Sequence, residues 1–356
     1  MVTPTRSLDM PLAAAQQQVQ VLHSSEGTAA WDALAAADAD GTFCHLHAWR
    51  GIMEDVLGHQ THYLEARAQD GTLSGILPLI RVRSRLFGDY LISVPFLNYG
   101  GPLGHGPARA ALCTEAMAIA RKLDVDLLEL RARDIAPPGL ALSARKLAVI
   151  VPLPASSEEL WEKQFRSKLR NKIKRPMNQG MECRFGPEQL DAFYDIFARN
   201  MRDLGTPVLP RRWFESISEL LGDVVVFAAV YWGDVPVAAG CGFLWNGEFE
   251  LSWSSAIREY NSRHPNMLLC WEMMKESIRR GATDFSFGRS TPDSSTHHFK
   301  QQWGGADVVL PWGTWGRRTA PPNPNSAKYR VARSVWSRLP LPVSRRLGPV
   351  LSPYIP

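Results

Sequence analysis

The chain has 356 residues, more than one hydrophobic core usually holds, so we expect two domains. A hydrophobic content of 45% with 21% charged residues is that of a globular protein. The five cysteines form no C-x-x-C pair, which argues against a zinc site and against a disulfide framework. No signal-peptide pattern and no run of about 18 apolar residues is present, which excludes a spanning helix and predicts a cytoplasmic protein without a metal.

The positive charge is concentrated in two segments. The net charge is +5, yet no acidic residue follows Asp307, and residues 1–316 carry a net charge of −3. The eight basic residues of the C-terminal segment are Arg317, Arg318, Lys328, Arg330, Arg333, Arg338, Arg345 and Arg346. Seven more, without an acidic residue, lie within 163–175. This pattern indicates local sites for anions and not a surface that coats nucleic acid.

The first half of the chain predicts, in order, a strand, two helices, a hairpin, another strand, a third helix and a last strand. We expect these elements at 18–22, about 28–37, about 46–57, 61–82 with a turn at 69–71, about 89–95, about 108–123 and 126–132. The loop FLNYGGPLGHGP before the third helix holds four glycines. Two readings stay open: a tight loop packed on the other domain, and a phosphate cradle, although the loop lacks the lysine and the spacing of a P-loop.

The second half repeats this order with little sequence identity. We expect a strand at 181–186, helices from Pro187 to Gly205 and at about 211–221, strands at 224–232, 235–245 and 248–256, a helix closed by Gly281, and a strand at 283–288. Asn246-Gly247 is a strong hairpin signal. The turn aspartates Asp70 and Asp234 lie 164 residues apart. The sequence therefore predicts one architecture present twice.

This order of elements resembles that of the GNAT acyltransferase fold, and two copies in tandem resemble the Fem family of peptidyl and acyl transferases. Four segments are similar to the FemAB-like proteins of exosortase (PEP-CTERM) and exopolysaccharide systems: FRSKLRNKIKRPMNQGM (165–181), NMRDLGTPV (200–208), PNMLLCWEMMKESIRRGATDFSFGRS (265–290) and FKQQWGG (299–305). The first half is similar mainly through VPFLNYGGPLG (94–104).

The resemblance implies an α/β (α+β) fold with two tandem GNAT-like (acyl-CoA N-acyltransferase) domains. The expected division is an N-terminal domain at 1–155, a C-terminal domain at 156–318 that includes a linking basic helix at 157–175, and a linker with a basic amphipathic tail at 319–356. The resemblance also implies an acyl or aminoacyl transferase in a cell-envelope or polysaccharide context.

In a GNAT-type site, the donor's phosphates bind at the N-terminus of the helix that follows two diverging strands. The fingerprint R/Q-x-x-G-x-G/A for acyl-CoA would align with 258–263, where Asn261 and Arg263 replace both glycines. Glycines let the backbone approach pyrophosphate, so the donor stays open between acyl-CoA and the aminoacyl-tRNA that some Fem-type proteins use. A solvated turn is the alternative. The predicted donor-binding residues are Trp253, Arg258, Asn261, Arg263 and Asn266.

The segment FSFGRSTPDSSTHHFKQQWGG (285–305) carries the predicted catalytic residues. Fem-like relatives have an aromatic–Lys pair here, which Phe299-Lys300 matches, and a lysine ammonium could stabilise a developing oxyanion. Arg289 could clamp a phosphate or carboxylate. Asp293 and either His297 or His298 could accept a proton, and only one of two adjacent helical histidines can face a cleft. The alternatives are an ordinary ion pair for Arg289, an exposed Lys300 and structural histidines.

Residues 157–175 predict an interdomain helix that begins at a Ser156–Glu159 capping box and ends before Pro176. Its apolar stripe is flanked by cations, which suits an anionic glycan, a nucleotide-sugar, a lipid-phosphate carrier or a tRNA end. A solvated face is the alternative. The predicted substrate-binding residues are Lys168, Arg170 and Lys174 here, Arg202 and Thr206 after the next helix, Asn98 and Tyr99 in the glycine-rich loop, and Phe299.

Residues 319–326 read as a linker. Tyr329, Ala332, Val335, Trp336 and Leu339 then recur at roughly helical spacing among arginines. This basic amphipathic tail could contact an anionic membrane or dock on its own protein.

The sequence thus predicts a Fem-type, N-acetyltransferase-like acyltransferase that modifies an amine or hydroxyl of a polysaccharide or cell-envelope precursor, in the cytoplasm or at the inner membrane face. The alternatives are an aminoacyl-tRNA-dependent transferase acting on a peptidoglycan precursor and a non-catalytic adaptor that binds a glycan or nucleic acid. Monomer and dimer stay open.

Overall fold

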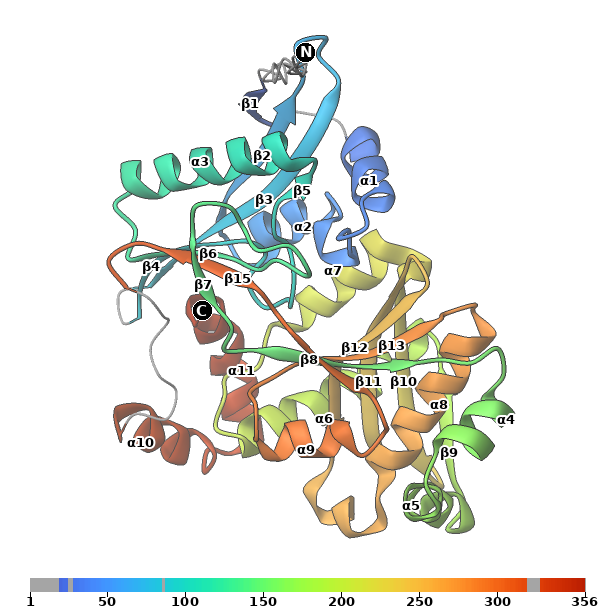
Figure 1. Cartoon of the computed structure of the whole chain (residues 1–356). Helices are drawn as coiled ribbons and strands as arrows, with labels where there is room; N and C mark the ends of the chain where they lie inside the picture. Colours follow the sequence, from blue (N-terminus) through green and yellow to red (C-terminus); the bar gives the residue numbers. More distant parts are fainter. Residues whose placement is uncertain (1–18, 25–27, 85–86, 319–326, 356) are drawn as a thin grey trace, which may run out of the picture.

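The computed structural model describes residues 19–24, 28–84, 87–318 and 327–355. Two mixed sheets, each with helices packed against it, lie one above the other in Figure 1. The linker predicted at 319–326 lies outside the described residues.

The first sheet has the strand order β1-β2-β3-β4-β6-β15-β7, with β5 paired to β3. Its strands are β1 (Gln20–His23), β2 (Gln60–Arg67), β3 (Leu73–Ser84), β4 (Gly88–Ile92), β5 (Leu103–Gly104), β6 (Leu127–Leu130), β7 (Ala141–Ser143) and β15 (Trp312–Trp315). Its helices are α1 (Thr28–Ala37), η1 (Phe43–His45), α2 (Trp49–Gly51), η2 (Ile52–Val56) and α3 (Gly106–Lys122).

The second sheet has the order β14-β8-β13-β12-β11-β10-β9. Its strands are β8 (Leu147–Pro152), β9 (Met181–Phe185), β10 (Val225–Trp232), β11 (Val235–Trp245), β12 (Glu248–Ala256), β13 (Asp284–Ser290) and β14 (Ala306–Val309). Its helices are α4 (Ser157–Glu159), η3 (Leu160–Gln164), α5 (Ser167–Asn178), η4 (Pro187–Gln189), α6 (Leu190–Asp203), α7 (Arg211–Leu221), η5 (Gly222–Val224), η6 (Arg258–Arg263), α8 (Pro265–Arg279) and α9 (Ser295–Gln301). The meander β10–β12 follows the predicted ranges closely, because tight turns at Gly233-Asp234 and Asn246-Gly247 fix its register.

The two sheets exchange strands. β8 comes from the first half of the chain but lies between β14 and β13 of the second sheet. In return, β15 comes from the end of the second half and lies between β6 and β7 of the first sheet. The division at 155/156 stays a prediction, and the chain crosses between the sheets on both sides of it.

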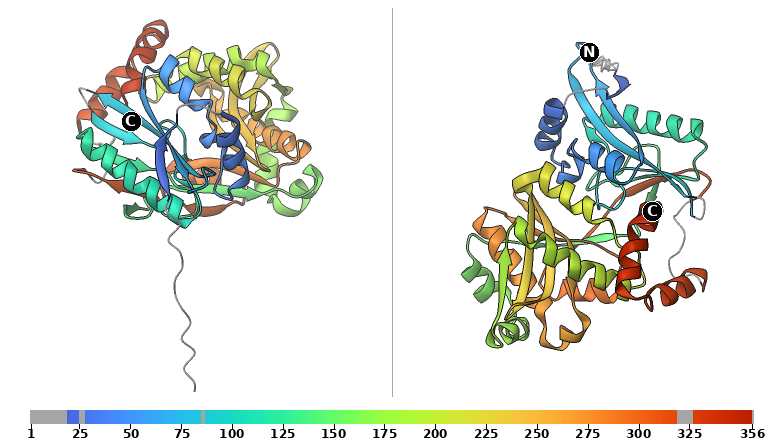
Figure 2. Two further views of the ribbon diagram at one scale, coloured as in Figure 1. Left: turned by 90° about the horizontal axis from the view of Figure 1, so that it is seen from above. Right: turned by 180° about the vertical axis from the view of Figure 1, so that it is seen from behind.

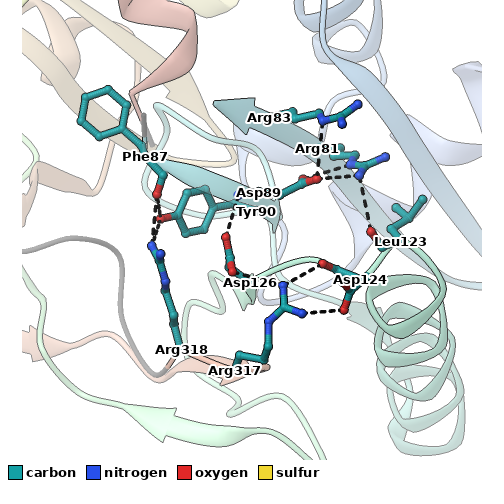
Figure 3. Close-up of polar contacts among 10 residues, drawn as sticks. All are labelled: Arg81, Arg83, Phe87, Asp89, Tyr90, Leu123, Asp124, Asp126, Arg317 and Arg318. Carbon is teal, nitrogen blue, oxygen red and sulfur yellow. Dashed lines mark hydrogen bonds and ion pairs between the residues drawn. The ribbon is translucent and has the colours of Figure 1, made fainter. Parts of the chain in front are cut away.

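A polar network fastens the returning chain to the first domain (Figure 3). The guanidinium of Arg317 binds the carboxylates of Asp124 and Asp126 at 2.7 and 3.2 Å. The guanidinium of Arg318 donates to the carbonyl of Phe87 at 3.1 Å and to the hydroxyl of Tyr90 at 2.9 Å. These two arginines of the basic C-terminal segment therefore serve the fold and are not free to bind a partner.

One hydrophobic core spans both domains. Phe43 of η1 stacks on Phe243 of β11 with ring centroids 4.1 Å apart, and Trp49 of α2 packs against Trp213 of α7. Trp213 and Phe243 are fully buried. Because aromatic contacts of this size dominate core energetics, the two GNAT-like halves form one structural unit.

The predicted interdomain helix is wrong in two respects. Residues 157–164 form α4 and the wider turn η3, the chain is extended at Phe165 and Arg166, and α5 then continues through Pro176 to Asn178. Moreover, α5 packs against α8 and β9, which both belong to the second domain. The Ser156 cap is confirmed, because its hydroxyl accepts from the amide of Glu159 at 3.2 Å.

The tail forms two helices, α10 (Ala327–Trp336) and α11 (Leu341–Leu351), followed by the turn η7 (Ser352–Tyr354). α11 packs against α6, and η7 contacts β3, so the tail docks where the two domains meet (Figure 2). Within the described ranges, no helix is both long and apolar enough to cross a bilayer.

Candidate active site

Strands β12 and β13 diverge in the second sheet. They pair in parallel over Glu248–Glu250 and Asp284–Ser286, and the pairing ends there although both strands continue. β13 bends at this point, because its register with β8 shifts between Ser286 and Arg289, and Gly288 adopts a φ of +62°. A Cβ at position 288 would lie 2.7 Å from the side-chain nitrogen of Asn98, so only glycine fits.

Glu250 lies at the point of divergence and is 1% exposed. One carboxylate oxygen accepts from Asn98 at 2.8 Å and from Ser252 at 2.6 Å. The other oxygen, Oε2, is buried and has no hydrogen-bond partner among the described residues. Burial raises the pKa of Glu250 to about 7, with the nearby Glu248 adding to the effect. A carboxylate with a free oxygen and this pKa is suited to accept a proton near neutral pH.

Lys300 faces the same point from α9 and is 8% exposed. Its ammonium donates to the carbonyls of Gly288 at 3.0 Å and Arg289 at 2.8 Å. Burial lowers the pKa of Lys300 to about 8, while the charge of Glu250 opposes that shift. The alternative of an exposed Lys300 is therefore wrong. Two of the three ammonium protons hold the bend of β13, which leaves one for a ligand or intermediate.

Arg289 is half-buried and makes no side-chain hydrogen bond or ion pair in the described part of the chain. Burial and the neighbouring Arg131 lower the pKa of its guanidinium to about 10. Both guanidinium groups lie over the ring of Trp312, at 5.6 Å for Arg289 and 4.9 Å for Arg131. Arg131 already pairs with Glu129 at 2.9 Å. Arg289 thus keeps its donors for an anionic group, and the ordinary ion pair considered for it is absent from the described contacts.

The first domain contributes a loop to this site, and its described residues form no equivalent opening. Beyond the parallel pair β4–β6, the chain keeps bonding to β6: the amide of Ser93 donates to Glu129, and the amide of Gly101 donates to Arg131, both at 3.0 Å. The loop 93–101 therefore fills the space in which strands of the first sheet would diverge. Its Asn98 reaches across to Glu250, so the predicted packing of this loop on the other domain is confirmed.

The N-terminus of α8 is surrounded by cations. The guanidinium carbon of Arg263 lies 4.3 Å from the ring centroid of Trp232. Burial lowers the pKa of His264, and the positive charges of Arg175 and Lys172 lower it further. The side-chain oxygen of Asn266 is buried without a partner in the described chain. However, residues 258–263 form the compact turn η6 and not a glycine cradle. The charges therefore fit the phosphates of an acyl-CoA, and side chains would have to replace the missing backbone cradle.

Several other predicted residues have no hydrogen bond or ion pair with Glu250 or Lys300 among the described residues. Asp293 and His298 are exposed, and the buried histidine is His297, which accepts from the amide of Asp293 and binds Asp307 at 2.9 Å. On α5, Lys168 and Lys174 are exposed and Arg170 caps the carbonyl of Trp161.

Arg202 binds Asp203 and the carbonyl of Leu339 in the tail, Thr206 lies in the turn after α6, and Arg258 and Asn261 are exposed on η6. Trp253 packs on Phe214 and Phe243 in the shared core, and Phe299 packs on the second domain's core. These contacts give Arg202 and Trp253 structural duties, and the functional roles assigned to this set stay predictions.

A pocket of about 290 Å³ opens between the end of α1 and the β11–β12 hairpin. Its polar lining includes Asp38, Arg133, Glu248 and Asp284. The guanidinium carbon of Arg133 lies 5.9 Å from the ring centroid of Tyr99. Burial raises the pKa of Tyr99, and the carboxylates of Glu250 and Glu248 raise it further. Tyr99 therefore lies beside Arg133, which lines the pocket, and within electrostatic reach of Glu250 and Glu248.

Residues 163–301 match the family model described as "Acetyltransferase (GNAT) domain". Among solved structures, FemX is similar with a TM-score of 0.62 and 14% identity, covering 83% of this chain and 96% of FemX. A tandem GNAT protein from the clavulanic acid biosynthesis pathway is similar with a TM-score of 0.53 and 12% identity, covering 85% and 100%.

The C-terminal domain of a putative lysylphosphatidylglycerol synthetase from Agrobacterium fabrum is similar with a TM-score of 0.54 and 12% identity, covering 86% of this chain and 95% of that one. No curated protein matches the sequence. The chain therefore has the tandem GNAT fold, and its predicted resemblance to the Fem type is confirmed at the level of the fold. The PEP-CTERM association stays a prediction.

Proposed function

We propose that the protein is a Fem-type acyl or aminoacyl transferase that modifies an amine or hydroxyl of a polysaccharide or cell-envelope precursor. The observation that supports this most is the buried Glu250, whose free oxygen lies where β12 and β13 diverge. In this proposal Glu250 takes the proton of the acceptor amine or hydroxyl as the new bond to the acyl carbon forms. Lys300 stabilises the negative charge that develops on the carbonyl oxygen.

The donor would bind with its phosphates near the N-terminus of α8. Arg263, Asn266 and the neighbouring Lys172 and Arg175 are the residues that would hold it. An activated thioester or ester supplies the acyl group, and this chain supplies charge and orientation. Because residues 258–263 form a turn without the glycines that bring the backbone close to pyrophosphate, aminoacyl-tRNA should be tested as a donor as well as acyl-CoA.

The acceptor would approach Glu250 from the pocket beside Tyr99. The carboxylates of Asp38, Glu248 and Asp284 line that pocket together with one guanidinium, that of Arg133, which pairs with Glu248. The excess of negative charge favours a neutral or amino-bearing part of the precursor over an anionic glycan. Asn98 and Tyr99 would contact the acceptor.

We expect acyl-CoA or charged tRNA to raise the melting temperature of the protein, because a ligand that binds only the folded state stabilises it by mass action. Transfer of a labelled donor group then separates the donors: consumption of a thioester identifies acyl-CoA, and loss of transfer after RNase treatment identifies tRNA. If no donor stabilises the protein and none is consumed, the adaptor alternative replaces this proposal.

The pH profile of the transfer rate should be a narrow bell. Because the pKa of Glu250 is about 7, the rate rises through neutral pH as this base loses its proton. Because the pKa of Lys300 is about 8, the rate falls again as the ammonium loses its charge. Measuring kcat/KM against pH tests this, with a pH-independent fluorescence signal as the control for folding. A plateau extending well above the pKa of Lys300 would remove the charge assigned to that residue.

A further inference from the structure

Helix α11 turns small residues toward the protein and large apolar residues toward solvent, the reverse of an ordinary surface helix. The residues it turns toward the protein are small: Ser344, Gly348 and, one turn on in η7, Ser352. A Cβ at Gly348 would lie 2.8 Å from the side chain of Val208, so the helix approaches its neighbour very closely. Large side chains cannot occupy this face.

Away from this contact, both tail helices expose large apolar side chains. Val331 and Val335 of α10 are spaced by one helical turn and are 65% and 59% exposed. Further large apolar side chains at least 40% exposed are Val343, Leu347, Val350, Leu351 and Tyr354. Isolated apolar residues on a surface are ordinary, but exposed apolar residues that recur at one-turn spacing along both helices indicate a binding surface. We call these seven residues the apolar face of the tail.

The charged residues of the tail itself are all basic. Arg333 and Arg345 are used internally, on the carbonyl of Leu204 and on Asp195. Arg330, Arg338 and Arg346 are exposed, and none of their guanidinium groups has a hydrogen bond or ion pair within the described ranges. No acidic residue lies between position 308 and the last residue. The apolar face is therefore surrounded by unpaired guanidinium groups.

The tail is held firmly against the body of the protein. Arg202 donates to the carbonyl of Leu339 at 3.1 Å, and Arg345 pairs with Asp195 at 2.6 Å. Tyr329 stacks on Phe87 of the first domain, with ring centroids 5.7 Å apart. These contacts fix α10 and α11 on the protein while their apolar side faces solvent.

We propose that α10 and α11 form a docking surface for an anionic lipid bilayer. Apolar side chains would enter the region between headgroups and acyl chains, and the three arginines would bind acidic headgroups. A second copy of the chain is the less suitable occupant, because like charges would face each other across a symmetric contact. The surface stands independently of the transfer site, so its failure would leave the proposed function untouched.

Sedimentation with vesicles tests this. The full chain should bind vesicles that contain phosphatidylglycerol and should bind pure phosphatidylcholine at least about tenfold more weakly, with salt weakening the former. The double substitution Leu347→Glu with Val350→Glu should reduce binding about tenfold or more. Arg338→Gln with Arg346→Gln should have an effect of similar size. Leu220→Glu is the matched control, since Leu220 of α7 is 56% exposed outside the tail.

Equal binding by the control and tail variants, or no preference for anionic vesicles, would overturn the proposal. Light scattering provides a second decision. If the Leu347→Glu, Val350→Glu protein is a monomer where the parent chain is a dimer, then a second copy covers the apolar face. Unchanged melting temperatures and unchanged transfer to a water-soluble acceptor show that the variants keep the fold.

Discussion

Replacing Glu250 with glutamine should abolish most transfer while making the protein more stable. A positioned general base contributes roughly 100-fold or more to a rate, so we expect kcat to fall by about that factor. Glutamine has the same shape and can still accept from Asn98 and Ser252, but it cannot take up a proton. The measurement is steady-state transfer with the donor identified in the thermal-shift screen.

The stability gain follows from the pKa of the same side chain. Burial raises the pKa of Glu250 from 4.5 to about 7, so the folded state holds its proton over a range in which the unfolded state has lost it. Stability is therefore lost as pH rises through that interval, by an amount on the order of 3 kcal/mol. Glu250→Gln removes this loss, and we expect its melting temperature above pH 7 to exceed the parent's by a few degrees.

The matched control for this experiment is Glu182→Gln, because Glu182 is exposed on β9 of the same sheet. It should change neither the rate nor the pH dependence of stability. The assignment fails if Glu250→Gln retains the parental rate together with the acidic limb of the pH profile. A lowered melting temperature with lost activity would instead identify Glu250 as a structural residue.

The order of the elements could be predicted from the sequence because local signals define them. The hairpin turns of the second sheet and the glycine that closes α8 are short-range features, and β10–β12 accordingly lie close to their expected positions. β8 and β15 escaped prediction. Their partners lie far away in the chain, so no local pattern indicates that β8 joins the second sheet and that β15 joins the first.

The candidate site was predicted in part. The prediction of Lys300 rests on the resemblance to Fem-like proteins and that of Arg289 on its place at the end of a strand, and both residues lie next to the point at which β12 and β13 diverge. Glu250 is absent from the predicted set, because EFELSWSSA (248–256) alternates polar and apolar residues like an ordinary half-exposed strand and does not indicate that this glutamate is buried. Its importance depends on Asn98, a partner from the other domain, which only the tertiary structure brings near.

Neither half of the chain should fold when separated at position 155/156. The fragment 1–155 carries β8 without its sheet and lacks β15 between β6 and β7. The fragment 156–356 lacks β8, so that β13 and β14 lose the strand between them. Each fragment also exposes its part of the shared aromatic core, including Phe43 in one and Phe243 in the other. Unpaired strand edges and exposed aromatic surface favour aggregation.

We therefore expect each fragment alone to show no cooperative unfolding and rapid amide exchange, and the two refolded together to form a 1:1 complex with the parent's fold. The control is the intact protein cleaved after folding at a protease site inserted at the exposed Ala155, whose halves should stay associated. A fragment that unfolds cooperatively by itself would show that its half is complete without the exchanged strand. Because β15 crosses back to β6 through contacts such as Gly313 with Leu130, such a result would contradict the strand exchange itself.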